Sequence, residues 1–279
     1  MRANSIGRRA GTFITTKEHR RFCEFADAVR KHCYIGLCYG SAGVGKTLSA
    51  RRYSNWHLAE PLLRTWGSRD PSAAKVYKAL ARSKAIFFTP TVSGTLSELR
   101  TELHLLNLRV GECIGQHLFL KDQKSYITSH ADTADMVELI VIDEAERLSN
   151  LALEHLRDTF DRIDIGLILI GMPGIEKRMA RYPQLYSRVG FVHHYRQLKG
   201  DELNFVLTRH WRKLGLNLDN TDFTDSQAIA AISRITAGNF RLLHRLFVQI
   251  ERILRINDLS VITEDVVEAA RSTLVIGAT

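Results

Sequence analysis

The sequence predicts an α/β domain, with a parallel sheet flanked by helices, followed by a small domain built only of helices. Short apolar runs alternate with segments of helical periodicity over the first two thirds of the chain, and after Gly200 only helical periodicity continues. The 279 residues suffice for one sizeable core and a smaller second one. We therefore expect a basic arm at 1–16, the α/β domain at 17–199 and the helical domain at 200–279.

Apolar spacing predicts the individual elements. Apolar residues recur at helical spacing from Lys17 to Lys31 and indicate an amphipathic helix, and a long helix is expected from Leu96 to about Leu118. Short apolar runs are expected to be buried parallel strands, with 191–195 as a candidate fifth: 34–39, 85–89, 137–142 and 165–170. The helices expected in the last domain are 201–214, 225–235, 240–256 and 264–274.

Composition limits the class of protein. An apolar fraction of 45% with 25% charged residues is typical of a globular chain, and no window reaches the roughly 18 to 20 apolar residues that span a bilayer. We expect no membrane association and a cytoplasmic location. The net charge of +9 favours a polyanionic partner, nucleic acid before membrane. The cysteines form no Cys-x-x-Cys pair, and a metal site is not expected from them or from His193 and His194.

A glycine-rich motif predicts a phosphate site. Gly40-Ser-Ala-Gly-Val-Gly-Lys-Thr47 matches Gly-x-x-x-x-Gly-Lys-Thr and lies between an apolar run and a predicted helix, which argues against a chance glycine-rich turn. Backbone N–H groups of such a loop surround phosphates at the positive end of the helix. Lys46 is expected to reach the β- and γ-phosphates of ATP, and the Thr47 hydroxyl to bind Mg²⁺. The expected nucleotide-binding residues are Gly40, Ser41, Ala42, Gly43, Val44, Gly45, Lys46, Thr47, Leu48 and Asp143.

A pair of acids ends the run at 137–142. Asp143 and Glu144 would emerge at the carboxyl edge of the sheet, where ligands of open α/β sheets bind. Asp143 is expected to bind Mg²⁺ together with Thr47, and Glu144 to polarise the attacking water as a general base. The alternative is a helix N-cap aspartate with an acidic first turn.

These motifs, with Ile165-Gly-Leu-Ile-Leu-Ile170 and Gly238-Asn-Phe-Arg241, resemble an AAA+ ATPase over residues 17–279. The helical domain would then be the lid of that superfamily. Within it, the chain is similar to the TniB, TnsC and MuB group of DNA-transposition regulators in three segments: 34–47, 140–148 and 169–178.

The resemblance implies two arginines that act on the γ-phosphate. Arg188 is placed like the arginine finger that one subunit offers to its neighbour, and the alternative is a solvated arginine in a basic stretch. Arg241 is placed like sensor 2 of the lid. A purely structural role is less natural for Arg241, because an arginine near a helix N-terminus is disfavoured by the helix dipole.

The sequence differs from the family at sensor 1. The run at 165–170 continues into Gly171-Met172-Pro173, without the polar residue that usually helps to place the water. We expect slow, switch-like ATP hydrolysis.

The long segment between the two motifs, from Lys46 to Asp143, contains the candidate DNA contacts. In the resembled group the equivalent part of the ring contacts the DNA backbone, which implies Arg100, Arg109, Lys121 and Lys124 here. The alternative for each is a solvated helix face. No zinc finger, basic zipper or RNA-recognition motif is visible, so any binding to double-stranded DNA should be sequence-tolerant.

Three functions are open at this stage. The first is an ATP-dependent regulator that forms a ring or helical filament on DNA and recruits or activates a transposase, with a target selector as a further partner. The second is a helicase loader or initiator, which should carry an additional DNA-binding domain after the lid. The third is a signalling or secretion-linked ATPase that binds no nucleic acid.

Overall fold

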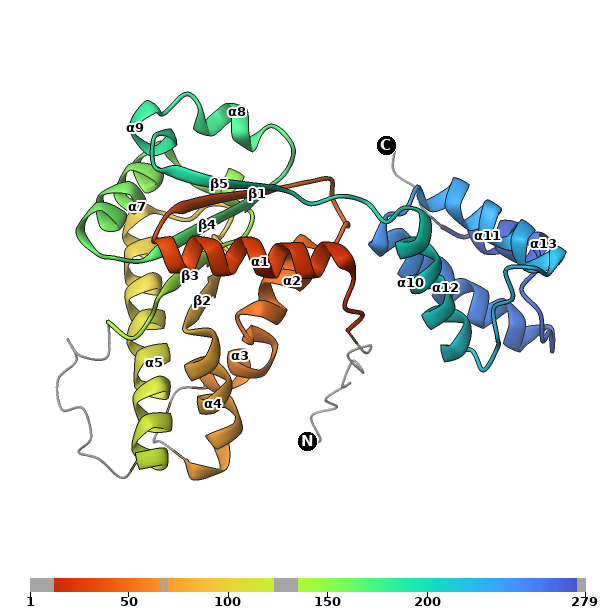
Figure 1. The fold of residues 1–279 in the computed structure, drawn as a ribbon, viewed down its shortest axis with the longest axis horizontal. Helices are drawn as coiled ribbons and strands as arrows, with labels where there is room; N and C mark the ends of the chain where they lie inside the picture. Colours follow the sequence, from red (N-terminus) through yellow and green to blue (C-terminus); the bar gives the residue numbers. More distant parts are fainter. Residues whose placement is uncertain (1–12, 66, 68–69, 123–134, 275–279) are drawn as a thin grey trace.

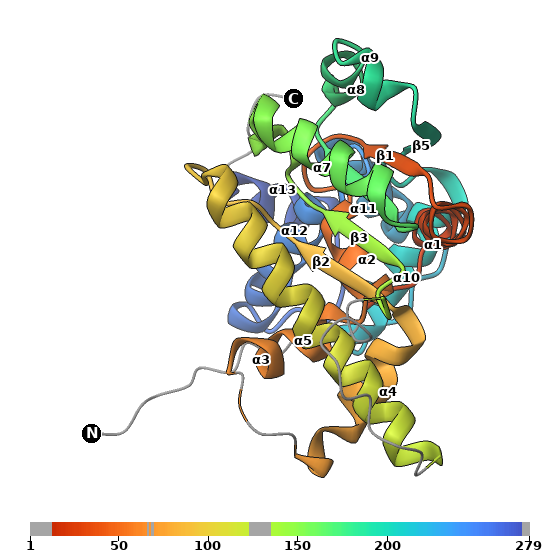
Figure 2. The ribbon, with the colours of Figure 1, turned by 90° about the vertical axis from the view of Figure 1, so that its left-hand side faces the viewer.

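The computed structural model describes residues 13–65, 67, 70–122 and 135–274. Within them the chain forms a parallel five-stranded sheet flanked by helices, and a group of four helices beside it (Figure 1). Figure 2 views the molecule from the side of helices α5 and α7, with the four-helix group behind them. The predicted fold class is confirmed.

The sheet has the order β2-β3-β4-β1-β5, and every pairing is parallel. Register sets Tyr39 opposite Gly171 and Ile142 opposite Leu169, so the carboxyl ends of the three central strands meet at one edge. All five predicted strands are present, with boundaries shifted by one or two residues: β1 Ile35–Tyr39, β2 Ala85–Phe88, β3 Leu139–Ile142, β4 Gly166–Gly171 and β5 Val189–His194.

Two helices of the α/β domain, α1 and α7, begin at side-chain caps. The Thr16 side chain accepts a hydrogen bond from the His19 N–H at the start of α1, and Ser149 does the same for α7. The predicted long helix α5 continues past Leu118 to Asp122, because residues 119–122 contain no helix breaker. The helices are α1 Lys17–His32, α2 Lys46–Tyr53, α3 Trp56–Arg64, α4 Ala74–Ser83, α5 Leu96–Asp122, α7 Asn150–Arg162, α8 Ile175–Met179 and α9 Pro183–Tyr186, with short 3-10 helices η1 Pro71–Ala73 and η2 Ala145–Arg147.

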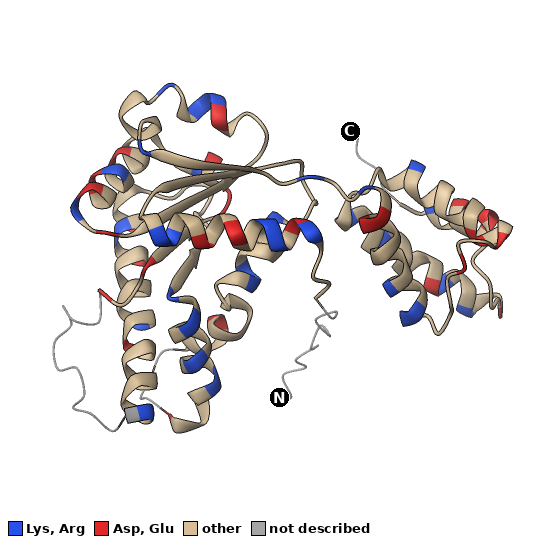
Figure 3. Ribbon diagram, viewed as in Figure 1, with Lys and Arg blue, Asp and Glu red and all other residues tan. Residues whose placement is uncertain are grey.

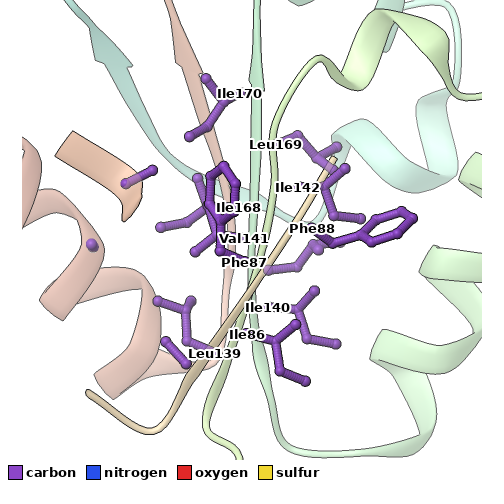
Figure 4. Packing of buried hydrophobic residues seen from close by; sticks show 14 of the residues in the cluster. Ile86, Phe87, Phe88, Leu139, Ile140, Val141, Ile142, Ile168, Leu169 and Ile170 are labelled. Carbon is purple, nitrogen blue, oxygen red and sulfur yellow. The ribbon is translucent and has the colours of Figure 1, made fainter. Parts of the chain in front are cut away.

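The three strands β2, β3 and β4 are buried on both faces, and their side chains form the centre of the core (Figure 4). Burial on both faces explains why these strands are continuous apolar runs in the sequence. Strand β5 is an edge strand with alternating burial. His193 packs on Phe25 at a ring separation of 5.5 Å, whereas His194 faces the other side and stacks on Tyr39. The two adjacent histidines therefore do not form one site.

The helical domain has its own core. Trp211 and Phe247 pack edge to face at 5.3 Å, and the Trp211 indole N–H donates to Asp225. Its helices are α10 Gly200–Lys213, α11 Phe223–Thr236, α12 Phe240–Ile256 and α13 Glu264–Ser272. In the described residues no helix is both long and apolar enough to cross a bilayer, and the four cysteines, all described, form no disulfide.

Most of the predicted basic arm, residues 1–12, lies outside the described residues. The last part of that segment is packed. The Phe13 ring meets the edge of His19 at 4.7 Å, Ile14 contacts the core of the helical domain, and Thr16 is buried as the cap of α1. Residues Phe13, Ile14 and Thr16 of the predicted arm are therefore packed on the rest of the protein.

Gly238, directly before α12, contacts Leu198 in the segment that connects the two domains. The Leu198 N–H donates to the Gly238 carbonyl at 3.0 Å, and Gly238 has a positive φ of 73°. A Cβ on Gly238 would lie 1.9 Å from the Leu198 carbonyl oxygen. Only glycine allows the chain before α12 to approach the interdomain segment this closely.

We predict that Gly238→Ala destabilises the protein far more than Gly215→Ala. Gly215 has a similar φ of 77° but nothing within 4 Å of an added Cβ. Gly215→Ala should therefore lose only about 1 kcal/mol of free energy of unfolding, which is the cost of a left-handed backbone conformation for a residue with a Cβ. Gly238→Ala adds a clash with backbone and should cost at least about twice as much free energy of unfolding. Chemical denaturation of both variants measures the difference, and equal losses would contradict the assigned contact.

Candidate nucleotide site

The loop Gly40–Gly45 joins β1 to α2 and carries Lys46 into the edge where the strands end. Lys46 is 8% exposed, and its ammonium donates to the carbonyl oxygen of Ser41 at 2.9 Å and to that of Gly40. Burial lowers the pKa of Lys46, which the nearby Asp143 carboxylate opposes. The lysine is thus held in a partly desolvated loop, where a phosphate would gain most from its charge.

Asp143 follows β3 and is 4% exposed. Its N–H donates to the Phe88 carbonyl at 2.8 Å, which joins the end of β3 to the end of β2. Burial raises the pKa of Asp143, while a hydrogen bond from the Thr47 hydroxyl opposes that rise. The structure therefore brings together Thr47 and Asp143, the two predicted magnesium ligands.

The donors present fit Mg²⁺. A hydroxyl and a carboxylate are the hard oxygen ligands that this ion takes, and it usually completes its shell with water and substrate phosphates. Within the described parts of the chain, no group of three or more His, Cys, Asp or Glu side chains could hold a metal ion. The site therefore suits an ion delivered with a nucleotide better than a metal caged by protein.

Glu144 lies beside Asp143 in an uncommon backbone conformation. Its φ is 53°, a left-handed value that is strained for glutamate and recurs at active sites. The side chain is half exposed, and its Oε2 atom lies 3.8 Å from an Arg147 guanidinium nitrogen. Arg147 in turn donates to the Pro90 carbonyl. Glu144 thus faces the site with an accessible carboxylate, as a general base requires.

The helical domain reaches the same loop. Asn239 caps α12 and donates from its amide to the Ala42 carbonyl at 2.7 Å. The Arg241 N–H donates to the Gly43 carbonyl at 2.9 Å. A cavity of about 710 Å³ is lined by Lys46, Thr47, Leu48, Thr89, Asp143, Glu144, Glu146, Gly171 and Arg241, among others. The cavity contains residues from both motifs and from α12.

Sequence reasoning missed a second, mostly apolar cavity of about 310 Å³ beside the loop. Val44, Gly45 and Leu48 of the loop region border it from one side, and Phe13 and Phe240 are among its other lining residues. Its lining suits the flat base of a nucleotide whose phosphates lie in the loop. The apolar pair Phe13 and Ile14, within a polar segment, was the available sequence signal. Glu146, which lines the larger cavity, was also missed.

Arg188 does not line either cavity. It lies before β5, and its guanidinium binds the Asp161 carboxylate at 2.7 Å and the Gln184 carbonyl. This hydrogen bonding holds the pKa of Asp161 below its usual range. A contact of Arg188 with a neighbouring subunit stays a prediction.

Only part of the candidate DNA set shares one surface. Arg100 and Lys121 are exposed on α5, whereas Arg109 is partly buried and donates to the Leu63 carbonyl at 2.8 Å. Helix geometry explains the difference. At about 100° per residue, Arg109 lies on the opposite side of the helix from Arg100, whereas Lys121 lies within about 60° of Arg100. Lys124 lies outside the described residues.

Two known proteins resemble this chain over most of its length. Over 267 residues the chain is 44% identical to a potential ATP-binding protein of Staphylococcus aureus, which covers 95% of this chain and 97% of that protein. Over 247 residues it is 25% identical to the Mu-like prophage FluMu DNA transposition protein B of Haemophilus influenzae, covering 85% of this chain and 72% of that protein.

Solved structures show the same fold at low identity. The RuvB Holliday junction branch migration motor of Thermotoga maritima superposes with a TM-score of 0.56 at 15% identity, covering 94% of this chain and 70% of that one. The ORC2 protein of Aeropyrum pernix gives 0.53 at 17% identity, covering 92% and 67%. Residues 29–179 match the family of the AAA domain, and with the 44% identical relative this shows that the chain belongs to the AAA domain family.

Proposed function

We propose that this protein is an ATP-hydrolysing regulator of DNA transposition that assembles on target DNA, as a ring or a helical filament, and recruits or activates a transposase. The observation that carries the proposal is the similarity to transposition protein B along 85% of the chain. A nucleotide site built from both motifs and α12 supports ATP dependence. The net charge of +9 supports a polyanionic partner.

The chemistry follows from the site residues. Lys46 and Arg241 bind the phosphates, and Thr47 and Asp143 hold Mg²⁺, which neutralises phosphate charge. Glu144 accepts the proton of the attacking water. Strand β4 ends in Gly171 and carries no polar side chain at its tip, so β4 itself contributes no group that places the water.

DNA binding would use backbone contacts. In the described part of the chain, basic residues lie on α1, α4, α5 and the helical domain, among other elements (Figure 3). Arg100 and Lys121 lie on the same side of α5, and 21 residues of helix separate them by about 30 Å, close to one turn of duplex DNA. Contacts with this spacing neutralise phosphates without reading bases.

Lys46→Ala should weaken ATP binding by about tenfold to a hundredfold, because a charge-assisted hydrogen bond to phosphate is lost. Nucleotide-dependent assembly should weaken with it. Calorimetry with ATP and Mg²⁺ measures the affinity, and the exposed Lys177→Ala is the charge-matched control. Unchanged affinity in Lys46→Ala would show that the phosphates bind elsewhere.

Arg188→Ala and Glu144→Gln test whether the site is completed across a subunit boundary. Each variant alone should hydrolyse ATP roughly 10² to 10⁴ times more slowly. Loss of a general base such as Glu144 usually has an effect of this size, and loss of an arginine finger has a comparable or larger effect. A mixture should recover activity, since some interfaces pair an intact Glu144 with an intact Arg188. If mixed assemblies form and stay inactive, Arg188 does not act in trans.

Duplex binding tests the proposed function as a whole. Binding should require ATP or a non-hydrolysable analogue, vary little with sequence, and weaken steeply with salt, because each neutralised phosphate releases about 0.9 of a counterion. The double variant Arg100→Ala with Lys121→Ala should reduce the salt slope by up to about two.

The matched control removes two other exposed basic residues, Lys177 of α8 and Arg181 shortly after it, and should leave the slope unchanged. Duplex binding that stays undetectable at low salt with the analogue present would overturn the transposition proposal and favour a signalling ATPase. Normal binding in both double variants would mean only that other residues contact DNA.

A further inference from the structure

The tip of β4 lies between the two nucleotide motifs. Gly171, the last residue of β4, pairs with Tyr39, which directly precedes the phosphate loop. On its other side β4 pairs with β3, which ends at Ile142, directly before Asp143 and Glu144. A polar group at this point would therefore stand between the phosphate loop and the general base. Strand β4 itself supplies none.

The Glu146 carboxyl group occupies this point. Glu146 belongs to the short helix η2 after Glu144, and its Oε2 atom lies 2.8 Å from where a Cβ on Gly171 would be. The glycine thus leaves room that the carboxyl group fills. Glu146 also lines the same cavity as Lys46 and Asp143.

Oxygen Oε2 of Glu146 is buried and has no hydrogen-bond partner among the described residues. A buried polar atom without a partner costs about 1 to 3 kcal/mol, so a water molecule or a ligand atom is its expected partner. Burial raises the pKa of Glu146, and the charge of Glu144 adds to the effect. The orphaned oxygen and its place in the cavity both point toward the nucleotide.

The backbone beneath Glu146 is held from a different helix. Arg178 of α8 donates to the Glu146 carbonyl at 2.9 Å and to the Leu148 carbonyl. These two bonds clamp the turn that carries Glu146, so its side chain starts from a fixed position. Ile175 of the same helix packs at Gly171.

We propose that Glu146 orients the attacking water, from the place that a polar residue of β4 would otherwise hold. The inference rests on the proposed ATP hydrolysis. The Glu146 carboxyl group hydrogen-bonds the water while Glu144 takes its proton. The water oxygen then bonds to the γ-phosphorus, the bond from that phosphorus to the bridging oxygen breaks, and ADP and phosphate leave.

Two variants of matched size test the role. Glu146→Gln keeps a polar group and should retain turnover within about threefold, whereas Glu146→Met fills the space without one and should lower kcat by about tenfold or more, the worth of one hydrogen bond. KM and ATP affinity should change little in both. Glu251→Ala, an exposed acid on α12, is the control, and thermal unfolding checks that each variant folds.

Gly171 gives a second, independent test. Gly171→Ser should lower kcat on its own, because its Cβ would displace the Glu146 carboxyl group. Combined with Glu146→Ala, the serine hydroxyl can occupy the vacated space, and kcat should exceed that of Glu146→Ala alone. The other atoms close to the added Cβ belong to Ile175: its Cδ1 atom, at 2.5 Å, is the end of a flexible side chain, and its Cβ atom lies at 3.2 Å.

The outcomes separate this inference from the proposed function. Loss in Glu146→Met together with rescue by serine supports the water-orienting role. Wild-type turnover in Glu146→Met, while Glu144→Gln is inactive, overturns that role and leaves ATP hydrolysis intact. Absence of ATP turnover in the wild-type protein with DNA present overturns both.

Discussion

The parallel hydrogen bonding of β1, β4 and β3 is the constraint on which the nucleotide site depends. Parallel strands in register end at the same edge, and this brings Lys46 and Asp143 together although 97 residues (143 − 46) separate them. The Thr47 hydroxyl then bonds the Asp143 carboxylate. Loss of register would separate the two motifs at once.

Burial at this edge decides the chemistry of the charged groups. Desolvation lowers the pKa of Lys46 and raises the pKa values of Asp143 and Glu146. All three charged forms are therefore less stable here than in water, and each gains from a partner of opposite charge. A nucleotide with Mg²⁺ offers phosphates to the lysine and a cation to the carboxylate. Binding of the complex thus relieves costs that the fold itself imposes.

Sequence reasoning predicted the fold well because the decisive signals were local. Runs of apolar residues, the glycine motif and Asp143-Glu144 each carry their meaning within about ten residues. Arg109 shows a first limit, since its place opposite Arg100 depends on which face of α5 meets the domain. Glu146 shows a second, because two acids two residues apart look alike in the sequence. Only the glycine at 171, 25 residues further on, gives Glu146 its place, and that pairing is tertiary.

The two domains have separate cores and are joined by hydrogen bonds. Each has its own apolar core, and a cavity of about 310 Å³ lies between them in place of continuous packing. Hydrogen bonds join the two domains. Asn239 and Arg241 bond the phosphate loop, and the Glu18 N–H of α1 donates to the Glu202 carboxylate of α10. Hydrogen bonds to water can replace these at small net cost, whereas separating two halves of one core cannot be offset in this way. Asn239 and Arg241 bond the loop that is proposed to hold the phosphates, so the start of α12 is coupled directly to that loop.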